Sequence, residues 1–369
     1  MLLNATFLDP SVSGGPETYL RGLARGLADE FPDVRLTVAT TRSGARALRA
    51  DGWMAWAQIA ELPCEDGQRV RRQVAEQVLV PALARRRDAD LVHSLASTAP
   101  IRALTPTVIT LHDVTFLVRP TFGAATTWGM REVITRAARH ADALITGSVA
   151  ARDEICAVLR MDPDDFLVVP HGRGRAPHSA AASEADVRRR LVLADAPVIL
   201  CVGAKRPHKN QEVVVRALAE LPEVVLVLAG HAEPYEEELR RIARQVGVEG
   251  RVRFVGYMPD DVLEALWALC ACAAFPTLGE GFGLPLVEAM DRGVAIAASD
   301  IPDLREVGGD VPFWFDPHSP AAAAHALAAA IDDADAGPRG RAQAARFTWE
   351  AAARGTMEAY ERALAHAAA

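Results

Sequence analysis

Residues 273–290 read AAFPTLGEGFGLPLVEAM, and this stretch decides the fold because it joins a short apolar strand to a glycine-rich loop and a helix start. Gly281 and Gly283 suit a tight loop whose backbone approaches a ligand. Proline is favoured in the first helical turn, so Pro285 predicts that the helix begins near Leu284. The stretch therefore reads as one βα unit of a parallel sheet.

The same alternation of strand and helix extends along the whole chain. Short aliphatic runs, nearly continuous in apolar residues, predict parallel strands that are buried on both faces. The simplest architecture is an α/β fold of two doubly wound, Rossmann-like parallel-sheet domains that face each other across a cleft. The first series of predicted strands lies at 2–8, 36–40, 91–95, 107–113, 143–148 and 166–172, and the second at 197–204, 224–230, 251–257, 273–277, 294–299 and 312–315.

Length and composition support two domains. The chain has 369 residues, half of them apolar, which is enough for two packed cores. The segment after residue 171 is rich in glycine, alanine, serine and proline, so we place a linker there. The predicted parts are a first domain at 1–171, a linker at 172–190, a second domain at 191–346 and a terminal amphipathic helix within 347–369.

Charge and cysteine content exclude several classes of protein. Forty basic and 48 acidic residues give a net charge of −8, which argues against a protein that grips nucleic acid through its phosphates. Five scattered cysteines without CxxC spacing suggest neither a disulfide framework nor a zinc site. No basic leader and no uncharged apolar run of about 18 residues is present, so we expect a cytoplasmic protein without a membrane span.

The loop after the strand at 273–277 is the first candidate site, because ligands of doubly wound sheets bind beyond the carboxyl ends of strands. The amides and dipole of the helix start suit a diphosphate. Glu288, in the first helical turn, is placed to accept hydrogen bonds from ribose, and Glu280 could reach a sugar hydroxyl. The alternative is a glycine-rich turn with two surface glutamates. Glu280 is a candidate for catalysis as well as for donor binding. The candidate donor-binding residues are Glu280, Gly281, Phe282, Gly283, Leu284 and Glu288.

The two glutamates, eight positions apart, resemble the signature of retaining glycosyltransferase family 4, also described as glycosyltransferase group 1 and rich in bacterial mannosyltransferases. The similarity extends over residues 8–30, 69–100, 108–171 and 198–360. It implies a GT-B fold whose first domain binds the acceptor, whose second binds the donor, and whose last helix packs back on the first.

The resemblance also implies the reaction. A hexosyl group would pass from a nucleotide diphosphate sugar, GDP-mannose or a UDP-hexose, to the hydroxyl of a glycan, lipid-linked or small-molecule acceptor. The anomeric configuration would be retained, and the nucleotide sugar would be a co-substrate, with no further cofactor. Two alternatives stay open: an epimerase or phosphorylase on the same fold, and a catalytically silent partner that binds sugar nucleotides.

A basic turn follows the first strand of the second domain. Residues 201–210 read CVGAKRPHKN, and cations at the carboxyl end of a strand could neutralise a departing diphosphate. A solvated basic turn is the alternative. The resemblance implies that Lys209 is the phosphate-binding lysine with a catalytic part. Many family members have arginine where this chain has Ala204, so Lys205 or Arg206 is the candidate replacement.

In the first domain, residues 13–17 resemble the glycine loop of the family, in which Gly15 would lie against the donor diphosphate. His112 ends the strand at 107–113 and resembles the histidine that lies beneath the donor sugar, with a positioning and electrostatic role in catalysis. His93 and His171 are expected to be structural.

Two further features of the sequence bear on function. Residues 69–87 carry six arginines around an apolar middle, which is typical of a solvated helix. The alternative is a face that contacts the acceptor or a membrane surface, but Pro81 interrupts the pattern and argues against membrane contact. The two DAD triplets at 88–90 and 333–335 do not follow strands. We therefore predict no metal site.

Overall fold

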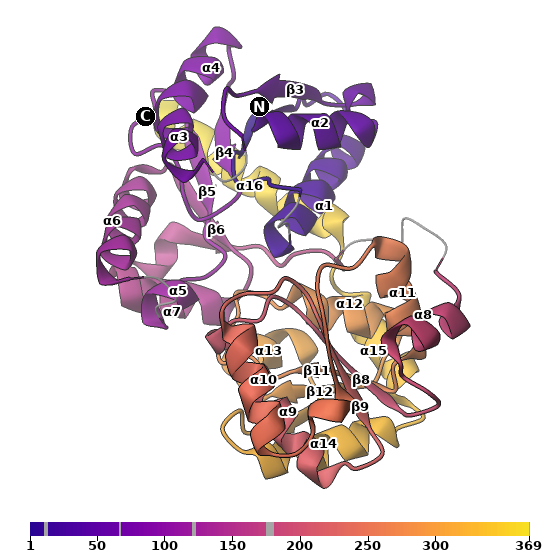
Figure 1. The fold of residues 1–369 in the computed structure, drawn as a ribbon. Coiled ribbons are helices and arrows are strands. Elements are labelled where there is room, and N and C mark those ends of the chain that lie inside the picture. The colour runs from indigo at the N-terminus through magenta and orange to yellow at the C-terminus, as the bar shows by residue number, and fades with distance from the viewer. Residues whose placement is uncertain (11–13, 66–67, 120–122, 175–180, 369) are drawn as a thin grey trace. The chain divides into compact units, whose positions relative to one another are not determined.

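The computed structural model describes residues 1–10, 14–65, 68–119, 123–174 and 181–368 (Figure 1). The chain forms two compact units. The first comprises residues 1–172 together with 348–369, and the second comprises residues 173–347. Each unit contains one parallel sheet covered by helices, so the two Rossmann-like domains predicted from the sequence are confirmed.

The first unit contains a seven-stranded parallel sheet in the order β3-β2-β1-β4-β5-β6-β7. Its strands are β1 Leu2–Ala5, β2 Thr37–Thr40, β3 Gln58–Glu61, β4 Val92–Ser94, β5 Thr107–Thr110, β6 Ala143–Thr146 and β7 Phe166–Val168. Its helices are α1 Gly15–Glu30, α2 Arg42–Ala50, η1 Trp53–Ala55, α3 Arg69–Val74, η2 Ala75–Leu79, α4 Val80–Arg86, α5 Thr115–Val118, α6 Ala124–His140, α7 Val149–Leu159, η3 Pro163–Asp165 and α16 Trp349–Ala368.

The second unit contains a six-stranded parallel sheet in the order β10-β9-β8-β11-β12-β13. Its strands are β8 Val198–Val202, β9 Val225–Ala229, β10 Val252–Val255, β11 Cys272–Phe275, β12 Ile296–Ser299 and β13 Phe313–Phe315. Its helices are α8 Glu184–Leu191, η4 Pro207–Lys209, α9 Gln211–Ala217, η5 Leu218–Glu220, α10 Tyr235–Gln245, η6 Glu249–Arg251, α11 Asp260–Leu269, α12 Leu284–Arg292, α13 Pro302–Gly308, α14 Pro320–Ile331 and α15 Ala336–Ala344.

All twelve predicted strands overlap observed strands, and β3 is the one that the apolar pattern missed. β3 lies at the edge of its sheet, where Gln58 and Glu61 are exposed. An edge strand needs only one apolar face, and four residues are too few for a visible alternation. The search for continuous apolar runs therefore could not detect it.

The end of the predicted linker is helical. Residues 184–191 form α8, which has acidic side chains in its first turn and arginines in its last, as the helix dipole favours. Val187 and Leu191 are buried. The residues of the linker at 175–180 lie outside the described residues.

The C-terminal helix α16 packs along α1 in the first unit, as the adjacent yellow and indigo helices in Figure 1 show. Close approach depends on glycine, because a side chain at Gly22 or Gly172 would overlap the Trp349 ring. None of the described helices is both long and apolar enough to cross a bilayer.

Each sheet reverses its strand order at one point, between β1 and β4 in the first unit and between β8 and β11 in the second. At such a switch point the loops beyond the two central strands diverge and leave a crevice, where doubly wound folds bind ligands. The loop after β8 carries Lys209, and the loop after β11 carries Glu280. The topology therefore brings two predicted site residues together.

Candidate functional site

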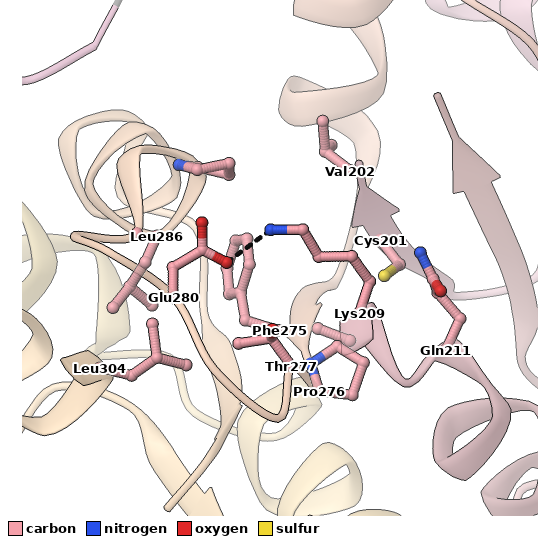
Figure 2. Close-up of a pocket in the computed structure, with 13 residues that line it drawn as sticks. Cys201, Val202, Lys209, Gln211, Phe275, Pro276, Thr277, Glu280, Leu286 and Leu304 are labelled. Atoms are coloured by element: carbon pink, nitrogen blue, oxygen red, sulfur yellow. Dashed lines mark hydrogen bonds and ion pairs between the residues drawn. The ribbon is translucent and has the colours of Figure 1, made fainter. Parts of the chain in front are cut away.

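A pocket opens at the switch point of the second unit, beyond the ends of β8 and β11 (Figure 2). Its wall is mostly apolar, and the charged side chains that line it are Lys209 and Glu280. The lining residues are Cys201, Val202, Lys209, Gln211, Ala274, Phe275, Pro276, Thr277, Glu280, Gly283, Pro285, Leu286 and Leu304.

Lys209 and Glu280 form an ion pair in this pocket. Figure 2 shows the ammonium and the carboxylate pointing toward each other, and Nζ lies 2.5 Å from Oε2. The two side chains are 26% and 20% exposed, so both are largely desolvated but still reachable from solvent. The pair is therefore a preformed dipole that an incoming polar ligand can contact.

Backbone hydrogen bonds join the two loops that carry the pair. The carbonyl of His208 accepts from the amide of Leu278 at 2.8 Å and from the hydroxyl of Thr277 at 3.1 Å. On one side the bonds end at His208, directly before Lys209, and on the other at Thr277 and Leu278, three and two residues before Glu280. The separation of Lys209 and Glu280 is thus set by the backbone as well as by their own attraction.

Asn210, to which the sequence analysis assigned no role, anchors the loop directly after Lys209. Its side-chain amide donates to the carbonyls of Pro276 at 3.0 Å and Pro317 at 2.8 Å. Its backbone is left-handed, with φ of 52° and ψ of 32°, a conformation that asparagine tolerates better than most residues. An asparagine directly after the key lysine, at a loop-to-helix junction, is the signal that could have revealed it.

The loop leading into α12 has the predicted form. Helix α12 begins at Leu284 with Pro285 in its first turn, and Gly283 precedes it with φ of +84°. A side chain at Gly283 would also crowd Leu304. Phe282 is buried with its ring against Phe347, 5.4 Å between centroids, so its side chain is part of the packing and only its backbone amide stays a candidate for ligand binding.

Glu288 is the fifth residue of α12 and so begins the second helical turn, which corrects its predicted place in the first. It does not line the pocket that contains Lys209. Gly174 lies directly against its side chain, and a Cβ atom there would overlap the carboxylate. Gly174 also has φ of +79°, so both space and backbone conformation demand glycine.

Lys205 and Arg206 do not line the pocket. The Lys205 side chain is fully buried, and its ammonium donates to the carbonyls of Gly230 and Val255, both at 2.7 Å. Burial lowers the pKa of Lys205, although Glu236, 3.4 Å away, opposes that shift. Arg206 pairs with Glu233 at 2.7 Å. The structure therefore does not bring Lys205 to the predicted donor site.

His112 lies in a buried aromatic cluster of the first unit. Its Nε2–H donates to the carbonyl of Leu95 at 2.8 Å, and its Nδ1 lies 3.2 Å from Nε2 of His171. The Tyr19 ring meets it edge-on at 4.9 Å. Burial lowers the pKa of both histidines. His112 is therefore neutral, and its Nδ1 accepts a hydrogen bond from His171.

His93 belongs to an adjoining hydrogen-bonded chain. Its two ring nitrogens lie 2.8 Å from the hydroxyls of Tyr360 and Thr110, and Thr110 in turn contacts the Tyr19 hydroxyl at 3.0 Å. Burial lowers the pKa of His93 to about 3. These contacts are those of a packed polar core, and Tyr19 and Tyr360 are members of it that the sequence analysis did not select.

Gly15 is the first residue of α1, and Ser13 of the predicted glycine loop lies outside the described residues. The described part of the chain contains no cluster of three or more histidine, cysteine, aspartate or glutamate side chains suited to a metal ion. Metal independence stays a prediction.

Two family models match the chain over most of its length. Residues 183–347 match the model described as glycosyl transferases group 1, and residues 13–173 match glycosyltransferase family 4. Among curated relatives, O-antigen chain mannosyltransferase B of Escherichia coli is 30% identical over 266 residues, which is 69% of this chain and 70% of the relative.

Other similarities are more partial or more distant. D-inositol 3-phosphate glycosyltransferase of Corynebacterium efficiens is 31% identical over 220 residues, or 55% of this chain and 52% of that protein. Among solved structures, Anabaena HepE in complex with UDP and glucose has a TM-score of 0.74 at 21% identity, with 98% of each chain covered. Sucrose-phosphate synthase of Thermosynechococcus elongatus has a TM-score of 0.76 at 20% identity, covering 99% of this chain and 98% of that one.

Proposed function

The chain belongs to the group 1, family 4 glycosyltransferases, and from this membership we propose that it moves a hexosyl group from a nucleotide diphosphate sugar to an acceptor hydroxyl. The family, the enzyme class and the GT-B fold predicted from the sequence are confirmed. The donor, the acceptor, the stereochemistry and the residue roles are the proposed part.

The observation that carries the proposal is the ion pair between Lys209 and Glu280 at the switch point. Breaking the glycosidic bond of the donor places negative charge on the leaving diphosphate. The Lys209 ammonium would stabilise that charge in a partly desolvated pocket, where an electrostatic interaction is stronger than in water. Glu280 would accept a hydrogen bond from a hydroxyl of the transferred sugar.

The neighbouring parts complete the donor site in this proposal. The amides from Gly281 to Leu284 and the start of α12 would bind the diphosphate, and Glu288 would bind ribose. Gly15 would contact the diphosphate from the first unit. His112, held neutral, would position the sugar near its reacting carbon.

Retention of configuration rests on the family resemblance, and it requires the acceptor to attack from the face that the diphosphate leaves. Orientation of the acceptor hydroxyl would then supply much of the remaining rate. A mannosyltransferase relative and structural neighbours with bound UDP support GDP-mannose or a UDP-hexose as donor. The acceptor would be a glycan, lipid-linked or small-molecule hydroxyl.

The first experiment identifies the nucleotide. Thermal unfolding of the purified protein would be followed with GDP, UDP, ADP and TDP, because a ligand that binds only the folded state stabilises it, by about 2.7 kcal/mol at 100 times its Kd. We expect GDP or UDP to raise Tm most. Hexose conjugates of that nucleotide would then be tested for diphosphate release.

The assay has outcomes that contradict the proposal. Tight nucleotide binding without release, with or without acceptors, would indicate a silent binding partner. Turnover that requires inorganic phosphate would indicate a phosphorylase. Loss of activity in excess EDTA that magnesium or manganese restores would contradict metal independence alone and leave the transfer reaction standing.

A further inference from the structure

The segment 69–86 forms one continuous helical run that the proposed reaction does not use. It consists of α3, the π-helical turn η2 and α4, with helical backbone angles at each junction. Pro81 lies at the start of α4, where a missing amide is tolerated after the wider π turn. The proline therefore does not interrupt the helix.

One side of this helix is apolar and exposed. Val70, Val74 and Val78 follow one another at intervals of four residues and are 77%, 55% and 58% exposed. Three of the eleven large apolar side chains exposed among the described residues thus lie in this single helix. Isolated exposed valines are ordinary, but an aligned series on one helix is a feature of interaction surfaces.

A neighbouring loop packs against this helix and carries another exposed apolar side chain. The side chain of Gln77 donates to the carbonyl of Ala99 at 2.8 Å and accepts from the amide of Ile101 at 2.9 Å, so it holds this loop against the helix. Further along the same loop, Leu104 is 85% exposed and Arg102 is exposed beside it.

The charge of this region is positive although the whole chain is acidic. Residues 69–87 contain six arginines and one glutamate, in a chain of net charge −8. The glutamate, Glu76, is buried, and its carboxylate accepts from the side chains of Asn4 and Thr98, both at 3.0 Å. It therefore presents no negative charge to solvent.

The exposed arginines are available for a partner. Arg71, Arg85, Arg86 and Arg102 are exposed, and within the described ranges none of them lies in an ion pair with a carboxylate. Such side chains can extend their apolar stems over a lipid surface while the guanidinium contacts phosphate. Positive charge of this kind complements anionic lipid headgroups.

We propose that the helix 69–86 and the loop around Leu104 form a docking surface for an anionic lipid bilayer. The valines and Leu104 insert among the headgroups and acyl chains, and the arginines bind lipid phosphates. Burial of apolar area and attraction to anionic lipid act together in this mode of peripheral binding. The chain would then carry out transfer close to a membrane surface.

The test uses the full chain and sedimentation with vesicles of phosphatidylglycerol and phosphatidylcholine, compared with phosphatidylcholine alone. We expect binding to the anionic vesicles that weakens as salt rises. Each basic residue near such a surface contributes about fivefold in partitioning, so Arg71→Gln, Arg85→Gln and Arg86→Gln together should lower it on the order of 100-fold. Val70→Ser, Val74→Ser and Val78→Ser together should lower it at least about tenfold.

A matched control comes from α8. The triple variant Arg189→Gln, Arg190→Gln and Val192→Ser removes two arginines and an exposed valine from the second unit and should bind vesicles like the wild type. Unfolding curves check that each variant is folded. Absence of wild-type binding, or equal loss in the α8 variant, would overturn the proposal. Dimerisation that the valine variant abolishes, without vesicle binding, would overturn it in favour of a contact between two copies.

Discussion

The loop after β8 contains two lysines in contrasting surroundings, one buried near its start and one in the pocket near its end. Lys205, near its start, is fully buried and donates to two carbonyls, that of Gly230 directly after β9 and that of Val255 at the end of β10. Lys209, near its end, lies in the pocket against Glu280. These are the chain's only two lysines, among 40 basic residues.

The difference suggests why arginine was not used at either place. A lysine ammonium is compact and can donate in three directions, whereas guanidinium is planar and larger. At Lys205 the ammonium fits between two carbonyls in a closed space, and at Lys209 it would fit beside a diphosphate. Two lysines four residues apart therefore differ in role according to their surroundings. The buried Lys205 is structural, and Lys209 in the pocket is a candidate for catalysis.

The largest effect is expected at Lys209. Lys209→Ala removes the cation proposed to stabilise the leaving diphosphate and should lower kcat by about 10²- to 10³-fold, or about 3–4 kcal/mol in the barrier. Its unfolding free energy should fall by less than the barrier rises, because Glu280, left without its partner, still reaches solvent. Steady-state transfer rates and urea unfolding measure the two quantities.

The control for Lys209 is an exposed pair elsewhere in the second unit. Arg244→Ala breaks the ion pair with Glu249, in which both side chains are more than half exposed. This pair lies outside the pocket, so its loss should cost less than about 1 kcal/mol with no change in kcat. Full activity of Lys209→Ala would remove that residue from the mechanism. Lys209→Arg should restore activity only partly if the compact ammonium matters.

Lys205 should respond in the opposite sense. Lys205→Met leaves two buried carbonyls without their donor and should lower the unfolding free energy by about 2–3 kcal/mol. Among molecules that remain folded, nucleotide affinity and kcat should be those of the wild type. A weaker nucleotide Kd in the folded Lys205→Met variant would instead place Lys205 in the donor site. The contrast between a structural Lys205 and a functional Lys209 would then be wrong.

Histidines of the first unit extend the comparison to pH. The folded pKa of His93 is about 3, below the ordinary value of 6.5, because burial disfavours the charged ring. The unfolded chain therefore takes up a proton first as pH falls, and stability is lost between about pH 6.5 and about pH 3. At pH 5 the loss from His93 alone should reach about 2 kcal/mol.

Urea unfolding at pH 7 and pH 5 tests this effect. His93→Gln should flatten the pH dependence by close to one proton. His112 and His171 are buried with lowered pKa values, so they add to the slope in the same direction. An unchanged slope in His93→Gln would mean that folding does not lower the pKa of this ring.

How far the sequence predicts the site depends on whether the cause is local. The helix start at Leu284 was predictable, because glycine and proline act on their own backbone. The contact between Lys209 and Glu280 depends on strands β8 and β11 being neighbours, and these residues are 71 positions apart. The family resemblance selected both residues, but only the fold shows that they pair.

The burial of Lys205 was not predictable for the same reason. Its partners Gly230 and Val255 lie at the carboxyl ends of two other strands, 25 and 50 positions away, and no local pattern distinguishes it from Lys209. Lys205 and Arg206 could therefore both be suggested as replacements for the usual arginine. Neither lines the pocket in the structure.

The smallest expected effect concerns Asn210, which holds the Lys209 end of the loop. Asn210→Ala removes hydrogen bonds to Pro276 and Pro317 and places alanine in a left-handed conformation, so the unfolding free energy should fall by about 1–2 kcal/mol. If these bonds also position Lys209, kcat should fall about tenfold while nucleotide Kd changes little, since the cation is still present but displaced.

Asn210→Gly separates the two causes, because glycine accepts the left-handed backbone yet lacks the amide. Equal loss of kcat in the glycine and alanine variants, with better stability in the glycine variant, would assign positioning to the side-chain hydrogen bonds. Recovery of kcat in the glycine variant would assign it to backbone conformation instead. In either case a drop in kcat would show that the position of Lys209 depends on this loop. Wild-type kcat in both variants would mean that Glu280 alone holds Lys209 in place.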